Sequence, residues 1–205
     1  MVRVETLAAP EINRREILRY AGCREADGDV RDLMEECIRL SQDALTYQIC
    51  WAEYDLPQQF ASRDLAKNLS GCRRAIVFGG TVGLGLDRLI ARYGRISPAR
   101  ALMLQAIGAE RIESLCDAFQ ACLRANGYRM RPRFSPGYGD LPLAAQRDIF
   151  DALQCAKHIG LSLNDSLLMS PSKSVTAIIG LTEGEDCAPA GCEQCAKADC
   201  QFRRN

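Results

Sequence analysis

The sequence lacks three features that would fix its class at once: an excess of charge of one sign, a long apolar run and a secretory leader. Lys plus Arg and Asp plus Glu number 26 each among 205 residues, so the formal net charge is zero and a nucleic-acid binder is not expected. No stretch approaches the roughly 18 apolar residues of a membrane span, and the N-terminus has no apolar signal-peptide core. The sequence therefore predicts a cytoplasmic protein with neither a membrane nor a nucleic-acid partner.

Signatures of catalysis and of nucleotide binding are scarce as well. The single histidine, His158, follows a predicted helix, where the helix dipole favours a cation, so a surface role is expected. Residues 74–85 run from an apolar strand into glycines, but they have neither the Lys-Ser/Thr of a P-loop nor a G-x-G-x-x-G spacing. We expect these glycines to let the following helix pack closely on the strand.

The most constrained stretch is 131–140, Arg-Pro-Arg-Phe-Ser-Pro-Gly-Tyr-Gly-Asp. Proline fixes φ and favours extended geometry in the residue before it, while glycine permits backbone shapes closed to other residues, so the loop should be rigid. It carries a planar guanidinium at Arg133, a hydroxyl at Ser135 and a polar-tipped ring at Tyr138. These groups suit a ligand with a carboxylate and a flat ring. The alternative is a Pro-rich turn whose arginine forms a surface salt bridge.

Two runs carry a resemblance to a known family. Residues 133–138, Arg-Phe-Ser-Pro-Gly-Tyr, and residues 160–180, which include Met-Ser-Pro-Ser-Lys-Ser-Val, resemble the activation domain of cobalamin-dependent methionine synthase. The resemblance is specific over 127–181, looser over 70–126 and weak before that. The resemblance implies an α+β fold, with helices packed on an antiparallel-rich mixed sheet. It also implies that S-adenosylmethionine binds at Arg133, Ser135, Gly137 and Tyr138.

The same resemblance draws attention to Glu113. Taken alone, this residue would be a solvated carboxylate on the surface of a predicted helix that ends near residue 125. Alignment of that helix with the family places Glu113 where a carboxylate contacts the ligand. A carboxylate there suits either the amino group or the ribose hydroxyls of S-adenosylmethionine.

The function that the resemblance implies is reactivation of a corrinoid enzyme, by reductive methylation of cob(II)alamin with S-adenosylmethionine. The cofactors carry that chemistry, so no catalytic acid, base or nucleophile is expected in the chain. No cobalamin-, homocysteine- or folate-binding region fits in 205 residues. The implied partner is therefore a separate methionine synthase or another corrinoid protein, with a flavodoxin- or ferredoxin-type electron donor. The alternatives are a metal-binding or electron-transfer accessory protein and a non-catalytic adaptor.

The last part of the chain differs in composition. Four of the eleven cysteines lie within fourteen residues, which suits a tetrahedral zinc site or an iron–sulfur cluster; redox-active or unligated thiols remain the alternative. A disulfide framework is not expected in a reducing compartment. The predicted metal ligands are Cys187, Cys192, Cys195 and Cys200.

The hydrophobic pattern places the elements along the chain. Short apolar and β-branched runs predict strands, and apolar residues at helical spacing predict helices. We divide the chain into an N-terminal part of helices and strands over 1–70, an activation-domain-like core over 71–183 and a Cys-rich tail over 184–205. Strands are expected over 2–7, 46–54, 74–79, 166–169 and 175–180, and helices over 14–21, 29–44, 62–69, 87–93, 98–125 and 143–157.

Overall fold

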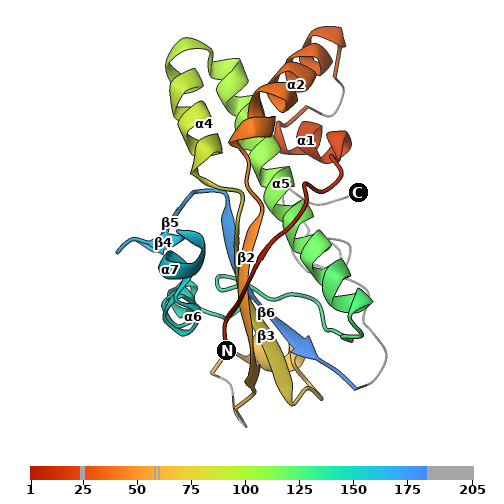
Figure 1. The fold of residues 1–205 in the computed structure, drawn as a ribbon, viewed down its shortest axis with the longest axis vertical. Helices are drawn as coiled ribbons and strands as arrows, with labels where there is room; N and C mark the ends of the chain where they lie inside the picture. Colours follow the sequence, from red (N-terminus) through yellow and green to blue (C-terminus); the bar gives the residue numbers. More distant parts are fainter. Residues whose placement is uncertain (24–25, 58, 60, 184–205) are drawn as a thin grey trace.

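The structure, a computed structural model, describes residues 1–23, 26–57, 59 and 61–183. An antiparallel sheet of four strands, in the order β1-β2-β3-β6, lies at the centre of the described chain (Figure 1). Two short strands, β4 and β5, pair only with each other. The strands are β1 (Arg3–Thr6), β2 (Gln48–Asp55), β3 (Arg74–Thr81), β4 (Ser162–Leu163), β5 (Met169–Ser170) and β6 (Ser174–Leu181).

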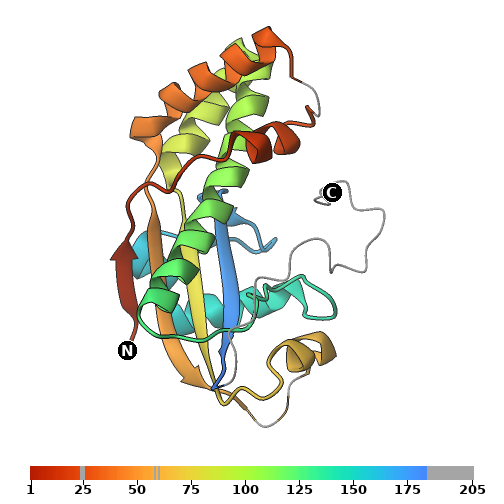
Figure 2. The same ribbon diagram turned by 90° about the vertical axis from the view of Figure 1, so that its right-hand side faces the viewer.

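Helices cover both faces of this sheet (Figures 1 and 2), which confirms the predicted α+β class. On one face α5 packs directly on the strands, and α1, α2 and α4 pack against α5. On the other face lie α6 and α7. The helices are α1 (Arg14–Tyr20), α2 (Gly28–Ser41), α3 (Arg63–Asn68), α4 (Leu84–Ile96), α5 (Pro98–Ala125), α6 (Gln146–Leu153) and α7 (Cys155–Ile159), with single 3₁₀ turns η1 (Gln42–Ala44) and η2 (Leu143–Ala145).

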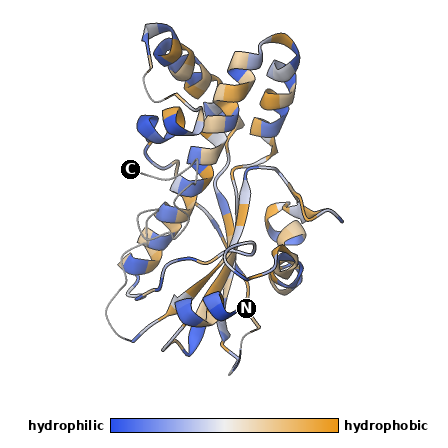
Figure 3. Cartoon of the chain, turned by 180° about the vertical axis from the view of Figure 1, so that it is seen from behind, coloured by the Kyte–Doolittle hydropathy of each residue, from blue (hydrophilic) through white to orange (hydrophobic). Residues whose placement is uncertain are grey.

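The long helix α5 has the bounds that the sequence predicts. Pro98 occupies its first turn, where a missing N–H costs no hydrogen bond, and Gly127 follows its end at φ +86°. Its buried face meets the sheet through Phe119, which packs on the rings of Phe78 and Trp51 at centroid distances of 5.2 and 5.8 Å. The only tryptophan is therefore a core residue. Hydrophilic and hydrophobic residues both occur along α2, α4 and α5 (Figure 3), as in amphipathic helices.

The segment after α5 lies beside β6 and extends the edge of the sheet (Figure 2). Arg131 N–H donates to the Gly180 carbonyl at 2.8 Å, and Phe134 and Ile178 exchange two backbone hydrogen bonds of 2.8 Å. Successive side chains of an extended segment point to opposite faces. Arg133 accordingly meets α5, while Phe134 packs on the far side among Leu65, Leu69 and Leu141.

A buried ion pair on α5 fixes the segment before α1. The side chains of Glu110 and Arg111 are each 2% exposed, with Arg111 Nε 2.5 Å from Glu110 Oε2. Arg111 also donates to the carbonyls of Pro10 and Glu11 at 2.7 Å, and Glu110 accepts from Asn13 N–H at 3.0 Å. Asn13 caps α1 by accepting from Glu16 N–H. The pair therefore positions α1 on α5.

Three expectations differ from the structure. The helix expected over 143–157 is broken at Gln154, whose left-handed backbone (φ +51°) separates α6 from α7. The strand expected over 166–169 is mostly a turn, and only Met169 of it belongs to β5, which pairs with β4. The spacing of apolar residues in the helix expected over 98–125 would place Cys122 on its buried stripe, but Cys122 is exposed.

None of the helices in the described ranges has both the length and the apolarity needed to cross a bilayer.

Candidate functional site

Arg133 lies against α5 and is held by three of its side chains. Its Nη2 donates to Glu113 Oε2 at 2.6 Å, and its Nη1 donates to Asp117 Oδ1 at 2.5 Å and to Gln120 Oε1 at 2.6 Å. The three acceptors lie four and three residues apart, so they form one stripe of the helix. We call these four residues the Arg133 cluster. The sequence predicts Glu113 and Arg133 as ligand contacts although they lie 20 residues apart in the chain. The structure brings their side chains together.

The Arg133 cluster is partly open. The exposed fraction is 22% for the Arg133 side chain, 38% for Glu113 and 58% for Asp117. Burial acts to lower the pKa of Arg133, but Cys116 and the carboxylates of Glu113 and Asp117 outweigh burial, so the pKa of the guanidinium is raised. Arg133 is a permanent cation, and with two carboxylates beside it the cluster has a formal charge of minus one.

Polar groups of the cluster remain available. A guanidinium has five N–H donors, and among the described residues Arg133 Nε and the second N–H of Nη2 have no partner. Gln120, 2% exposed, uses its oxygen for Arg133, while its Nε2 is buried without a hydrogen-bond partner in the described chain. Buried donors of this kind are uncommon in folded proteins, and they point to a missing ligand or water.

The loop after Arg133 is fastened to the N-terminus of α3. Asp140 accepts from the Ser62 hydroxyl and from the backbone N–H groups of Arg63 and Asp64, the latter two at 2.8 and 3.2 Å. These hydrogen bonds, the Ser62 hydroxyl first, lower the pKa of Asp140 from its ordinary value of 3.8. In return, Asp140 N–H donates to Asp64 Oδ2 at 3.1 Å. The contact joins two segments about 76 residues apart, and it makes the loop an integral part of the fold.

The two glycines of the loop have left-handed backbones, at φ +90° for Gly137 and +52° for Gly139. Gly139 also lies so close to α3 that a Cβ there would be 2.2 Å from Asp64 Oδ2. Gly137 N–H donates to the Leu141 carbonyl, and Tyr138 N–H donates to the Ser135 carbonyl. The loop is therefore a compact turn, which agrees with the rigidity expected from its glycines and prolines.

Ser135 and Tyr138 lie at the surface of this turn. The Ser135 hydroxyl has no hydrogen-bond partner among the described residues. The Tyr138 residue is 56% exposed and contacts the Phe134 ring edge to face, at a centroid distance of 6.0 Å. Pro136, between them, is buried. The turn thus holds a half-buried hydroxyl at Ser135 and an exposed aromatic ring at Tyr138, and that ring packs on Phe134.

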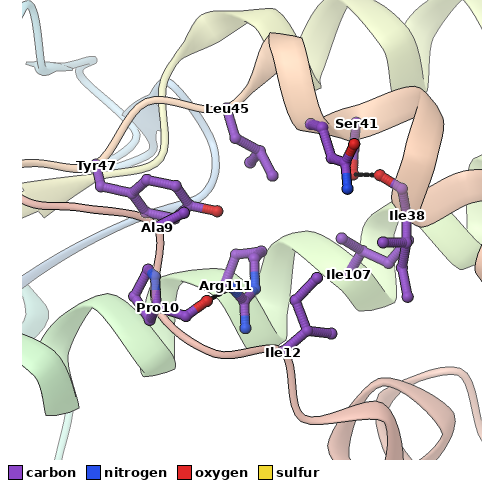
Figure 4. A pocket seen from close by; sticks show the side chains of 10 residues that line it. Ala9, Pro10, Ile12, Ile38, Ser41, Leu45, Tyr47, Ile107 and Arg111 are labelled. Atoms are coloured by element: carbon purple, nitrogen blue, oxygen red, sulfur yellow. Dashed lines mark hydrogen bonds between the residues drawn. The ribbon is translucent and has the colours of Figure 1, made fainter.

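A cavity of about 240 Å³ lies between the segment before α1, the end of α2 and α5 (Figure 4). Its polar lining comes from Tyr47, Arg111, Ser41 and Gln42, and its apolar walls include Ile12, Ile38 and Ile107. Arg111 is already committed to Glu110 and two carbonyls, so its guanidinium serves to hold the fold at this cavity.

The predicted metal ligands Cys187, Cys192, Cys195 and Cys200 lie outside the described residues. Within the described ranges no group of three or more His, Cys, Asp or Glu side chains is arranged to hold a metal ion.

Sequence reasoning missed three residues of the site. The spacing of Asp117 and Gln120 from Glu113 shows in the sequence that they share one stripe of the helix. That all three bind Arg133 depends on the fold. Asp140 follows the Gly-Tyr-Gly turn in the sequence, yet its role as an anchor depends on α3, which is remote along the chain.

Comparison with protein-family models gives no match, and no curated protein matches the sequence. Among solved structures, the chain is similar to the MetH reactivation domain bound to AdoHcy (S-adenosylhomocysteine). The TM-score is 0.67 with 14% sequence identity, over 93% of this chain and 81% of that chain. At this identity the likeness shows that the two share a fold.

Proposed function

We propose that the chain binds S-adenosylmethionine at the Arg133 cluster and supports methylation of a corrinoid on a separate protein. The observation that carries the proposal is the pairing of Glu113 with Arg133, directly before the Tyr138 turn in the chain, in a fold shared with a domain that binds S-adenosylhomocysteine. The sequence resemblance to the activation domain of methionine synthase points to the same ligand at the same residues.

The charges of the cluster suit this ligand. S-adenosylmethionine carries a sulfonium and an ammonium against one carboxylate, so it has a net positive charge, while the Arg133 cluster is formally minus one. Arg133 is not a free cation waiting for a carboxylate, because Glu113 and Asp117 already hold it. Its two remaining donors can still bind the ligand carboxylate, and Glu113 can accept from the ligand ammonium or ribose.

The remaining roles follow from exposure and position. The ligand, when bound, supplies the methyl group that a cob(II) corrinoid accepts together with one electron. The Ser135 segment contributes polar backbone and hydroxyl groups, and the exposed ring of Tyr138 borders the ligand on the side open to a partner. The chain itself orients the ligand and shields it from water, which is the contribution expected of a protein whose cofactors carry the chemistry.

Calorimetry with S-adenosylhomocysteine tests the binding site. We expect wild type to bind, and Arg133→Ala to lose about tenfold or more in affinity, because a charge-assisted contact is removed. Arg129→Ala is the matched control, since Arg129 lies in the same segment but is exposed and outside the cluster. Equal affinity of the wild type and Arg133→Ala, or no binding by either, would refute the proposed site.

A methylation assay tests the action on a separate protein. The chain is incubated with a cob(II)alamin-loaded methionine synthase that lacks its own activation region, a reductant such as reduced flavodoxin, and S-adenosylmethionine. Formation of methylcobalamin that depends on the chain supports the proposal, whereas binding of the corrinoid protein without methylation identifies an adaptor. The visible spectrum of anaerobically purified protein separately tests the predicted iron–sulfur cluster or zinc at the cysteine tail, because only a cluster absorbs there.

A further inference from the structure

The turn between β5 and β6 is fixed by side chains from two other elements. Ser172 donates to both oxygens of Asp87 at the start of α4, through its N–H at 2.7 Å and its hydroxyl at 2.6 Å. Ser174 donates to Thr81 Oγ1 at 2.8 Å, and Val82 N–H donates to the Lys173 carbonyl at 3.1 Å. The backbone of Lys173 therefore has a defined position over α5.

The stem of Lys173 lies tightly against a glycine of that helix. A Cβ placed on Gly108 would be 2.8 Å from Lys173 Cγ and 2.6 Å from Leu86 Cδ2, so no other residue fits there without displacing them. Burial lowers the pKa of the Lys173 ammonium, and the nearby Asp87 only partly opposes this effect. The lysine stem is thus packed in the structure, unlike that of a solvated lysine in an open turn.

The ammonium group of Lys173 has no hydrogen bond and no ion pair among the described residues. Asp87, the acid that most affects it, already receives two hydrogen bonds from Ser172. Lys173 borders a cavity of about 290 Å³, which we call the Lys173 cavity; the other lining residues are Tyr20, Leu102, Gln105, Ala106 and Ala109. A partly buried cation with three donors is most stable beside an oxyanion.

From this geometry we infer that the Lys173 cavity binds the carboxylate or phosphate of a small organic acid. Lys173 pairs with the anion, the amide of Gln105 adds a hydrogen bond, and Leu102, Ala106 and Ala109 contact an apolar part of the ligand. The site is separate from the Arg133 cluster, whose net charge has the opposite sign, and it requires no S-adenosylmethionine. Ala109 lies one helical turn from Glu113, so a ligand here would be a neighbour of that cluster.

The test uses the small number of lysines in the chain, namely Lys67, Lys157, Lys173 and Lys197. Reductive methylation with carbon-13 formaldehyde keeps their charge and labels each ammonium for NMR, and Lys173→Met assigns its signal. Inorganic phosphate, acetate and benzoate are then titrated at constant ionic strength. We expect the Lys173 signal alone to shift with saturation. Benzoate should shift the Lys173 signal at a lower concentration than acetate, because its ring contacts the apolar wall. A shift with phosphate at lower concentrations than with either carboxylate would identify a phosphate site, and the reverse order a carboxylate site.

A second measurement compares the affinity of variants for the best of these three anions. Lys173→Met should lower it by about tenfold or more, Lys173→Arg should retain binding, and Lys157→Met is the control on an unrelated lysine. Equal affinity in Lys173→Met, parallel shifts of all lysine signals, or no shift at Lys173 with any of the three anions would overturn the inference. None of these readouts involves S-adenosylhomocysteine, so the inference and the proposed function can fail independently.

Discussion

Replacing Arg111 by methionine should be among the most destabilising single changes in the described chain. Arg111 is 1% exposed and donates to both oxygens of Glu110 as well as to the carbonyls of Pro10 and Glu11. Methionine fills similar space but leaves a buried carboxylate without its counter-ion and two carbonyls without a donor. Breaking a buried pair in this way costs about 3–5 kcal/mol, a large part of the roughly 5–15 kcal/mol that stabilises a typical domain.

Urea unfolding, followed by fluorescence of the buried Trp51, measures this loss. With a denaturant dependence of about 2 kcal/mol per molar urea, the midpoint should fall by roughly 2 M. Arg14→Met is the control, because the Arg14–Glu35 ion pair is exposed and its loss should change the midpoint little. Adding Glu110→Gln to Arg111→Met should restore part of the stability, since it removes the unpaired charge. A midpoint equal to that of Arg14→Met, or no recovery in the double variant, would refute the reasoning.

Three further predictions concern the loop and the thiols. Gly139→Ala should destabilise by at least about 1–2 kcal/mol in urea unfolding, because a side chain at positive φ is strained and would also meet Asp64; wild-type stability would contradict the stated geometry. The lowered pKa of Asp140 means that its stabilising contribution is present above pH 3.8 and is lost as the pH falls through the lower folded value. Between about pH 4 and 2, the stability of Asp140→Asn should therefore fall less steeply with decreasing pH than that of the wild type. The same pH dependence in both proteins would exclude this role. Mass spectrometry after brief iodoacetamide treatment at pH 8 should find Cys122 alkylated and Cys116 intact, because burial raises the pKa of Cys116 to about 12; equal alkylation would show that Cys116 is accessible.

Local signals account for most of the elements that the sequence predicts. The helix expected over 98–125 has the bounds of α5, because Pro98 in its first turn and Gly127 after its end are local signals. The short alternating run at the N-terminus is β1, and it pairs with β2. By contrast, the pairing of β5 with β4 follows from contacts between segments, which periodicity does not encode.

The break at Gln154 shows a different limit. The apolar pattern of 143–157 continues through this position, so the sequence predicts one helix. In the structure Gln154 adopts a left-handed backbone, a conformation that carries a cost for any residue other than glycine. The two short helices then bring Leu153 and Cys155 into the same apolar cluster beneath the sheet, and both residues are fully buried there. Burial in the folded protein thus outweighs a local preference, which the sequence alone cannot reveal.

For the candidate site, the sequence predicts Glu113 and Arg133 but neither their pairing nor the parts played by Asp117 and Gln120. The salt-bridge interpretation of Arg133 applies, since its guanidinium is paired with Glu113 and Asp117. The ligand-binding interpretation stays a prediction, for which two donors of the guanidinium remain available. The pairing has a physical purpose in the proposed site: a long side chain that is already held loses less conformational entropy when a ligand binds. Glu113 and Asp117 lie on the rigid helix α5, and the Tyr138 turn is fixed to α3 through Asp140. In the proposed site, the side chains that would contact the ligand are therefore positioned before it binds, which is how a protein contributes orientation to a reaction carried by its cofactors.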